Sequence, residues 1–235
     1  MNSLSFNLKE LTVSNRDSIL SIEGIHFSFN SNEHSFAILG GSGMGKTTIF
    51  KSLFSKYILL WAKERAFKFS CEHIYNDITI NEKTLKDNKI SVKIGFATQF
   101  PYFFLSQTVR ENLFAPLKWK KMFWDDQQRQ NYISLFELEN IIDKEMSILS
   151  GGQIQLINIA RMLIIKPEIA IIDECFSNMD EHMSMKYINI IKNNFRDCLF
   201  LITSHRKFDV EKLGCKAIRL VKEKYRSGKY FVTQE

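Results

Sequence analysis

A glycine-rich stretch beginning at Gly40 has the residue types and spacing of a phosphate-binding loop. It carries the pattern G-x-x-x-x-G-K-[ST], between an apolar run that predicts a buried strand and a pattern that predicts a helix. Glycines let backbone N–H groups converge on an anion, and the helix adds its unpaired N–H groups and positive dipole end. We expect Lys46 to reach the β- and γ-phosphates of a nucleotide and the Thr47 hydroxyl to bind Mg²⁺. The loop comprises Gly40, Gly41, Ser42, Gly43, Met44, Gly45, Lys46, Thr47 and Thr48. The alternative is a glycine-rich turn with a chance Lys-Thr pair.

Two carboxylates follow a second apolar run of strand length, residues 169–172. Because the carboxyl ends of parallel strands meet at one edge of a sheet, Asp173 and Glu174 are expected beside the phosphate-binding loop. Asp173 would hold Mg²⁺ through water, and Glu174 would orient and deprotonate an attacking water. The alternative is that both acidic residues cap a turn.

A third segment reads Leu-Ser-Gly-Gly-Gln at the start of a predicted helix. Its hydroxyl, flexible backbone and unpaired N–H groups would form a second anion cradle. One domain needs only one cradle for one nucleotide, so we expect the second to serve a nucleotide held by another copy or a related cassette. The cradle comprises Ser150, Gly151, Gly152 and Gln153. The alternative is a plain Ser-capped helix.

These motifs and their order resemble those of the nucleotide-binding domain of ATP-binding cassette (ABC) transporters, over nearly the whole chain. The resemblance implies roles for three further residues. Gln99 resembles the family's Q-loop glutamine, which touches Mg²⁺ and the attacking water. Asp180 matches the D-loop that runs across the dimer seam, and His205 matches the switch histidine that contacts the γ-phosphate. Each of the three alone would be an ordinary polar residue, but their order and spacing favour these roles.

The resemblance implies an α/β fold of the P-loop NTPase class and ABC type. Its mixed central sheet would be flanked by helices, with an antiparallel β-subdomain at the N-terminus and an inserted helical subdomain. We expect one ABC ATPase domain over residues 1–235, with a core of residues 1–99 and 150–235. Residues 100–149 would form the helical subdomain, which extends into the helix after Ser150. Alternating strand and helix patterns argue for an α/β core independently of the resemblance.

Hydrophobic patterns predict several further elements. Residues 4–35 alternate apolar and polar positions, which predicts several short, mostly antiparallel strands. The helix after the phosphate-binding loop is expected to run to about Arg65. Residues 109–145 have a helical pattern.

Composition excludes few function classes. Among 235 residues, 45% are hydrophobic and the net charge is +6, which fits a nucleotide site, an acidic membrane surface or nucleic acid. The four cysteines form no C-x-x-C pair, so reduced thiols are expected, with Cys71 and Cys198 as small core residues. Without an 18-residue apolar run or a signal-peptide pattern, the chain is expected neither to span a membrane nor to be secreted by itself.

The resemblance also implies an activity and partners. The chain would be an ATP-hydrolysing subunit, bound at the cytoplasmic face of the inner or plasma membrane, that powers separate permease subunits. Two cassettes, with a homodimer favoured over a heterodimer, would face each other head to tail, so that each ATP lies between Lys46 of one copy and Ser150 of the other. No nucleic-acid partner is expected.

Two other classes are weighed against a transporter subunit. One is a non-transport ABC ATPase acting on ribosomes or DNA, whose paired cassettes or long coiled-coil insertion this chain lacks. The other is an ATP-binding partner with little turnover, against which Glu174 and His205 argue.

Some positions depart from the family's pattern. Ser14 and Asn15 stand where an aromatic residue usually stacks on adenine, which leaves adenine stacking open. Cys175 replaces a usual Pro or Ala, and Ile154 replaces a basic or polar residue. None of these replaces a residue that the chemistry demands.

Two aromatic segments predict where a permease would dock. The residues after Gln99 resemble exporter cassettes, so export is slightly favoured, although residues 143–147 lack the glycine-bearing loop that exporters have there. Phe100–Leu105 and Lys118–Trp124 combine rings with basic residues and suit a groove for a permease's cytoplasmic helix. The alternative is that these rings fill the core of the helical subdomain.

Overall fold

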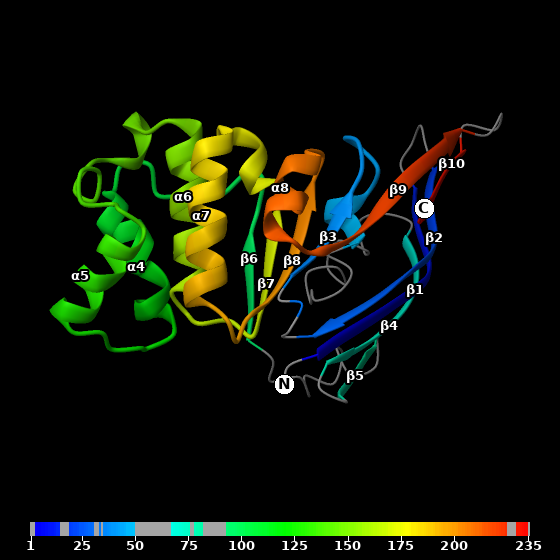
Figure 1. Cartoon of the computed structure of the whole chain (residues 1–235), viewed down its shortest axis with the longest axis horizontal. Coiled ribbons are helices and arrows are strands. Elements are labelled where there is room, and N and C mark those ends of the chain that lie inside the picture. The colour runs from blue at the N-terminus through cyan, green and yellow to red at the C-terminus, as the bar shows by residue number, and fades with distance from the viewer. Residues whose placement is uncertain are drawn as a thin grey trace.

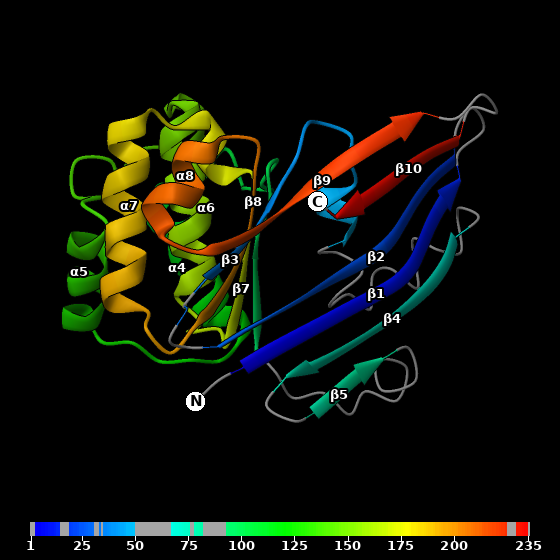
Figure 2. The same ribbon diagram turned by 45° about the vertical axis from the view of Figure 1, so that its right-hand side comes forward.

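One continuous sheet runs through the described part of the molecule (Figure 1, Figure 2). The structure, a computed structural model, describes residues 3–14, 19–30, 33, 35–49, 67–75, 78–81, 93–224 and 229–234. Its strands are β1 (Ser3–Ser14), β2 (Ile19–Asn30), β3 (Ser35–Leu39), β4 (Phe67–Tyr75), β5 (Ile78–Asn81), β6 (Ile94–Ala97), β7 (Ile169–Asp173), β8 (Leu199–Ser204), β9 (Lys216–Lys224) and β10 (Lys229–Gln234). Within the described ranges these strands pair in the order β5-β4-β1-β2-β10-β9-β3-β8-β7-β6.

The half of the sheet formed by β9, β3, β8, β7 and β6 is parallel. All residues of β7 and β8 are buried. Strands covered on both faces need no polar alternation, which explains their nearly continuous apolar sequences. Because the strands run in the same direction, the segments that follow β3, β7 and β8 all leave from one edge of the sheet. That edge carries the predicted chemistry.

The other half of the sheet is antiparallel. β1 pairs with β2 from Ser3 opposite Asn30 to Ser14 opposite Ile19, and on its other side it pairs with β4. β10 joins the two halves, since it runs parallel to β2 and antiparallel to β9. The prediction of several short strands over residues 4–35 was wrong in length: β1 and β2 have 12 residues each. Hydrogen bonding on both sides of β1 keeps it continuous, a tertiary effect that local alternation does not reveal.

Helices cover the parallel half. They are α4 (Val109–Trp119), α5 (Asp126–Leu135), α6 (Gly151–Leu163), α7 (Glu181–Asn194) and α8 (Lys207–Leu213), with short 3-10 turns η1 (Met146–Ile148) and η2 (Cys175–Asn178). In Figure 1, α4 and α5 lie at the end of the molecule away from β1, β2, β4 and β5. α6 contacts α4 on one side and β6 and β7 on the other. The fold is therefore α/β, with a parallel central sheet flanked by helices.

Capping side chains set where three helices begin. Thr108, Asp125 and Ser150 each accept a hydrogen bond from the third helical N–H, and the side chain at that position bonds back. Such a capping box satisfies two otherwise unpaired donors and stops the helix from extending backwards. The helical pattern expected over residues 109–145 is confirmed for α4 and α5, whereas residues 120–125 and 136–145 are not helical.

Two predictions fall partly outside the described residues. Residues 46–49 form the first turn of a helix after the phosphate-binding loop, but the rest of the stretch expected to reach Arg65 is not among them. Cys198 is buried, as expected for a core residue, whereas the side chain of Cys71 is not described.

Candidate functional site

The loop after β3 has the backbone shape that a phosphate-binding loop needs. Gly43 and Gly45 have φ angles of 75° and 81°, in the left-handed region that favours glycine. The Ile49 N–H donates to the Gly45 carbonyl at 2.8 Å, which starts a helical turn directly after the loop. A pocket of about 220 Å³ opens here, lined by Gly43, Met44, Gly45, Lys46, Thr47, Thr48 and Glu174. The structure thus brings the predicted loop and one of the predicted carboxylates together.

Lys46 is the buried cation of this pocket, with 4% of its surface exposed. Its ammonium group donates to the carbonyls of Gly40 and Gly41, both at 2.8 Å. It also forms a 2.8 Å ion pair with Glu174. Three oxygen partners hold a compact ammonium charge at the mouth of the loop, where a phosphate oxygen would compete for it.

Thr47 and Asp173 form an oxygen-rich pair beside Lys46. The Thr47 hydroxyl lies 2.9 and 2.7 Å from the two carboxylate oxygens of Asp173, and the Thr203 hydroxyl donates to one of them at 2.6 Å. A hydroxyl and a carboxylate are hard oxygen donors of the kind that Mg²⁺ prefers. Within the described residues, no group of three or more His, Cys, Asp or Glu could hold a metal ion. The donor set therefore fits an Mg²⁺ that takes most of its ligands from nucleotide phosphates and water.

Glu174 is the point where the predicted catalytic residues meet. Its φ of 53° is a left-handed value that is unusual for a residue other than glycine. The Glu174 N–H lies 3.0 Å from the Thr203 hydroxyl and 3.2 Å from its carbonyl, which fixes this turn. Gln99 donates to the Glu174 carboxylate at 3.1 Å, and His205 Nδ1 lies 3.9 Å from it. The constellation is a carboxylate surrounded by an amide, an imidazole and an ammonium group.

Two buried polar residues of α6 hold the segment of Gln99, a role that the sequence pattern does not reveal. Gln155 donates to the Gln99 carbonyl at 2.7 Å, and Asn158 donates to the Thr98 carbonyl at 2.8 Å. Each is only 2% exposed. Asn158 also donates weakly to the Cys175 sulfur at 3.6 Å, and burial raises the pKa of that thiol. Polar residues on the apolar face of a helix are the signal that could have revealed them.

Asp180 and the Leu-Ser-Gly-Gly-Gln segment lie outside the pocket of Lys46. Asp180 caps α7, where its carboxylate accepts from the Met183 N–H at 2.7 Å. Ser150 caps α6 through a capping box with Gln153. Ser150 and Gly151 are exposed, and a Cβ at Gly151 would meet nothing within 4 Å. The plain helix cap is therefore real, and the anion-binding roles of these residues stay predictions.

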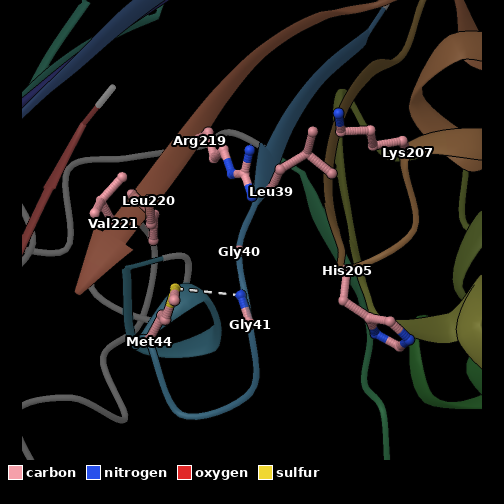
Figure 3. A pocket seen from close by; sticks show the side chains of 9 residues that line it. All are labelled: Leu39, Gly40, Gly41, Met44, His205, Lys207, Arg219, Leu220 and Val221. Atoms are coloured by element: carbon pink, nitrogen blue, oxygen red, sulfur yellow. Dashed lines mark hydrogen bonds between the residues drawn. The ribbon is translucent and has the colours of Figure 1, made fainter.

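A larger cavity of about 590 Å³ lies beside the first glycines of the loop (Figure 3). Figure 3 shows His205 and Lys207 on one side of it and Met44, Leu220 and Val221 on the other. The Gly41 N–H donates to the Met44 sulfur at 3.2 Å, and a Cβ at Gly40 would meet that sulfur at 3.0 Å. His205 thus both lines this cavity and approaches Glu174. The lining residues are Leu39, Gly40, Gly41, Met44, His205, Lys207, Arg219, Leu220 and Val221.

The predicted docking segments are divided between surface and core. Large apolar side chains are exposed at Phe100, Tyr102, Phe104, Leu105, Trp119 and Phe123. Others in the same segments, Phe103, Met122 and Trp124, pack against the core. The interpretation that the large side chains of these segments fill the core is therefore wrong for the exposed group and correct for the group that packs against the core. Ser14 ends β1, and Asn15 lies outside the described residues, so adenine stacking stays open.

Comparison with known proteins supplies the family. The family model described as "ABC transporter" matches residues 22–177. The lipoprotein-releasing system ATP-binding protein LolD of Buchnera aphidicola is 30% identical over 80% of this chain and 82% of its own length. The methionine import ATP-binding protein MetN 1 of Bacillus thuringiensis is 30% identical over 97% of this chain and 66% of its own. The ADP conformation of MJ1267, an ATP-binding cassette of an ABC transporter, superposes with a TM-score of 0.67 at 19% identity, covering 98% of this chain and 89% of that one.

No helix in the described ranges is long and apolar enough to cross a membrane. With a family match over more than half of its length and the loop, strand and carboxylate geometry described above, the chain belongs to the ABC transporter family and is similar to its ATP-binding subunits.

Proposed function

We propose that this chain hydrolyses ATP as the motor subunit of an ABC transporter, and that two copies close head to tail around the nucleotides. One observation carries the proposal. Lys46, Thr47 and Glu174 line one pocket, and Asp173 binds the Thr47 hydroxyl beside it, while the helix start at Ser150 lies apart from the pocket and is exposed. A chain that builds two anion cradles at separate places completes a site by meeting another copy, which a head-to-tail pair related by a two-fold axis allows.

The residues around the pocket have distinct tasks in this proposal. Lys46 binds the terminal phosphates, and Glu174 orients the attacking water and takes its proton. Thr47 and Asp173 would hold Mg²⁺, which neutralises charge on the phosphates. Gln99 and His205, both close to the Glu174 carboxylate, orient the water and contact the γ-phosphate respectively. Catalysis then consists of positioning and electrostatic stabilisation.

An ATP-binding partner without turnover would need none of this convergence on Glu174. The contacts of Lys46, Gln99 and His205 with its carboxylate therefore favour hydrolysis. ATP-driven closing and reopening of the pair would be the mechanical output, a population shift driven by ligand binding.

Complementation between two inactive variants tests the composite site. Lys46→Ala removes the phosphate-binding cation, and Gly151→Glu places a negative charge at the exposed helix start. The structure has room for a side chain at Gly151, and an acidic residue there suits the helix dipole, so this variant is expected to fold. In a mixed dimer, one of the two sites combines an intact Lys46 with an intact Gly151.

An equal mixture should therefore recover roughly a quarter of wild-type phosphate release, because half of the dimers are mixed and each has one intact site. Each variant alone should release almost none. A mixture that stays inactive, although wild-type protein is active and the mixed dimers form, would show that each chain builds its whole site by itself.

The exposed rings after Gln99 are the proposed permease contact, at the cytoplasmic face of the membrane. Phe104 is 53% exposed, whereas the neighbouring Phe103 lies under the Arg161 guanidinium at 4.0 Å and packs on the core. Phe104→Ala should reduce co-purification of a membrane partner from native cells without changing the melting temperature. Phe103→Ala, the matched control, should lower the melting temperature instead. Full retention of the partner by Phe104→Ala would remove this contact from the proposal.

The residue pattern after Gln99 favours export, and the direction of transport stays a prediction. Two relatives are named for lipoprotein release and methionine import. In inside-out vesicles carrying the purified complex, export predicts ATP-dependent accumulation of cargo inside, and import predicts its loss.

A further inference from the structure

The guanidinium group of Arg206 joins two segments, that of His205 and that of Asp180, to which the proposed function gives different roles. One Nη donates to the Met179 carbonyl at 2.6 Å, and the other donates to the Ser184 hydroxyl at 2.9 Å. The guanidinium also binds both carboxylate oxygens of Asp209, at 2.5 and 3.1 Å. The planar fork of arginine suits such simultaneous, directional contacts better than the point charge of lysine.

Asp209, the acidic partner of Arg206, is bonded to the end of β8, directly before His205. Asp209 lies in the first turn of α8 and is fully buried. It also accepts from the hydroxyl of Ser204, the last residue of β8, at 2.8 Å. The Arg206 N–H in turn donates to that hydroxyl at 3.0 Å. The Arg206–Asp209 ion pair is therefore linked to both residues that flank His205, through the Ser204 hydroxyl and through Arg206 itself.

The other partners of Arg206 belong to the segment of Asp180. Met179 directly precedes Asp180, and Ser184 lies in the first turn of α7 that Asp180 caps. The Ser184 hydroxyl also donates to the Phe176 carbonyl at 3.5 Å, so the same contacts extend towards η2. Arg206 thus fastens the turn around Asp180 to the end of β8.

The His205 ring itself is weakly held. Its side chain is 49% exposed, and its nearest hydroxyl, that of Ser177, is 3.4 Å from Nδ1. The position of the ring therefore follows from its backbone and from the segment that carries Ser177 and Asp180. Both are fixed relative to each other by the four contacts of Arg206.

We propose that Arg206 is a positioning residue for ATP hydrolysis, which transmits the placement of the Asp180 segment to the switch histidine His205. The inference rests on the proposed function, in which Asp180 lies at the seam between two copies and His205 contacts the γ-phosphate. Closing of the seam would then set the ring of His205 through Arg206. Arg206 touches no nucleotide itself.

Kinetics of Arg206 variants test this coupling. Arg206→Gln should lower the single-turnover hydrolysis rate about 10- to 100-fold, the cost of a small misplacement, while the Kd for ATP changes less than about twofold. Arg206→Lys, which keeps the charge opposite Asp209 but loses the fork, should lie in between. In a His205→Ala background, Arg206→Gln should have almost no further effect, because both act on one step. Losses that multiply in the double variant, or an unchanged rate in Arg206→Gln, would overturn the proposal.

A double variant that replaces both charges of the Arg206–Asp209 pair with neutral side chains separates an effect on stability from an effect on positioning. Arg206→Gln alone leaves the Asp209 carboxylate buried without its counter-charge, so that variant is expected to melt earlier. Combining Arg206→Gln with Asp209→Asn removes both charges and should restore the melting temperature but not the hydrolysis rate. If the rate recovers together with the melting temperature, the role of Arg206 is structural only. Arg110→Gln, which breaks the exposed pair with Asp143, is the matched control and should change neither quantity.

Hydrogen exchange tests, without hydrolysis, whether the Arg206 contacts hold the Asp180 segment to the end of β8. Arg206→Gln should speed amide exchange over residues 177–184 and leave α4 and α5 unchanged, because only local opening is eased. If the wild-type protein binds ATP but releases no phosphate, the proposed function fails. The exchange result then decides by itself whether Arg206 holds the Asp180 segment in place. Unchanged exchange over residues 177–184 would overturn that role.

Discussion

The phosphate-binding pocket and the exposed start of α6 are both predicted anion cradles, but their polar groups are held in opposite ways. Lys46 in the pocket and Asp173, which binds Thr47 beside it, are 4% and 2% exposed, and both bind other groups of the same chain. At the start of α6, Ser150 and Gly151 are exposed, and space surrounds Gly151. Buried charged side chains that are held in fixed positions can stabilise a reaction, whereas an exposed helix start only offers N–H groups to an anion that binds there.

The largest expected effect lies in the pocket. Glu174→Gln keeps the size of the side chain but removes the base, so phosphate release should fall at least about 100-fold. The variant should still bind ATP and accumulate as a nucleotide-bound dimer. Phosphate release and size-exclusion chromatography with Mg²⁺-ATP measure the two effects. Unchanged turnover would show that Glu174 is not the base.

The next largest effect is on nucleotide binding by the dilute, monomeric protein, which shows which of the two cradles binds ATP within one chain. Lys46→Ala should weaken ATP binding about 10- to 100-fold, because it removes a charge-assisted hydrogen bond from a buried site. Gly151→Glu should leave this binding within about twofold, because the open helix end serves another copy. Equilibrium titration with a fluorescent ATP analogue measures both. Equal losses in the two variants would mean that both cradles of one chain bind the same nucleotide.

A smaller effect distinguishes a helix cap from an anion cradle. Ser150→Ala and Thr108→Ala each remove a capping box and should lower the free energy of unfolding by about 1 kcal/mol. Only Ser150→Ala should also reduce phosphate release, because Thr108 caps a helix outside the proposed seam. Urea titration and phosphate release measure the pair. Equal activities in the two variants would reduce Ser150 to a plain cap.

The last effect appears only at high pH and tests whether Cys175, which directly follows Glu174, is closed to water. Burial raises the pKa of the Cys175 thiol. Above the ordinary thiol pKa of about 8.5, the unfolded chain loses this proton while the folded protein keeps it, so stability falls as the pH rises. Cys175→Ala should remove about 1.4 kcal/mol per pH unit from that decline. Urea unfolding of wild type and variant at pH 7 and at higher pH measures it, and identical declines would mean that water reaches Cys175.

Much of the site was predictable because local patterns carry it. The Gly40–Thr48 loop, the apolar run before Asp173 and the capping Ser150 depend on neighbours in sequence, and the structure places them at a strand end, a strand end and a helix start. α8 was not predicted, since its seven residues are too few for a helical period to stand out. The supports of the site were missed as well: Gln155, Asn158 and the Arg206 contacts join residues far apart along the chain.

The amino-acid sequence by itself determined the family, the α/β fold and the residues that meet around Glu174. It did so because glycine torsions, helix caps and uninterrupted apolar strands are properties of short segments. Only the tertiary structure decided which rings are exposed and which polar groups are joined. Neighbouring Phe103 and Phe104 differ in exposure because the packed surface of α6 covers one and not the other. Arg206 gained its role in the same way, through partners on α7 and α8 that the folded chain brings to it.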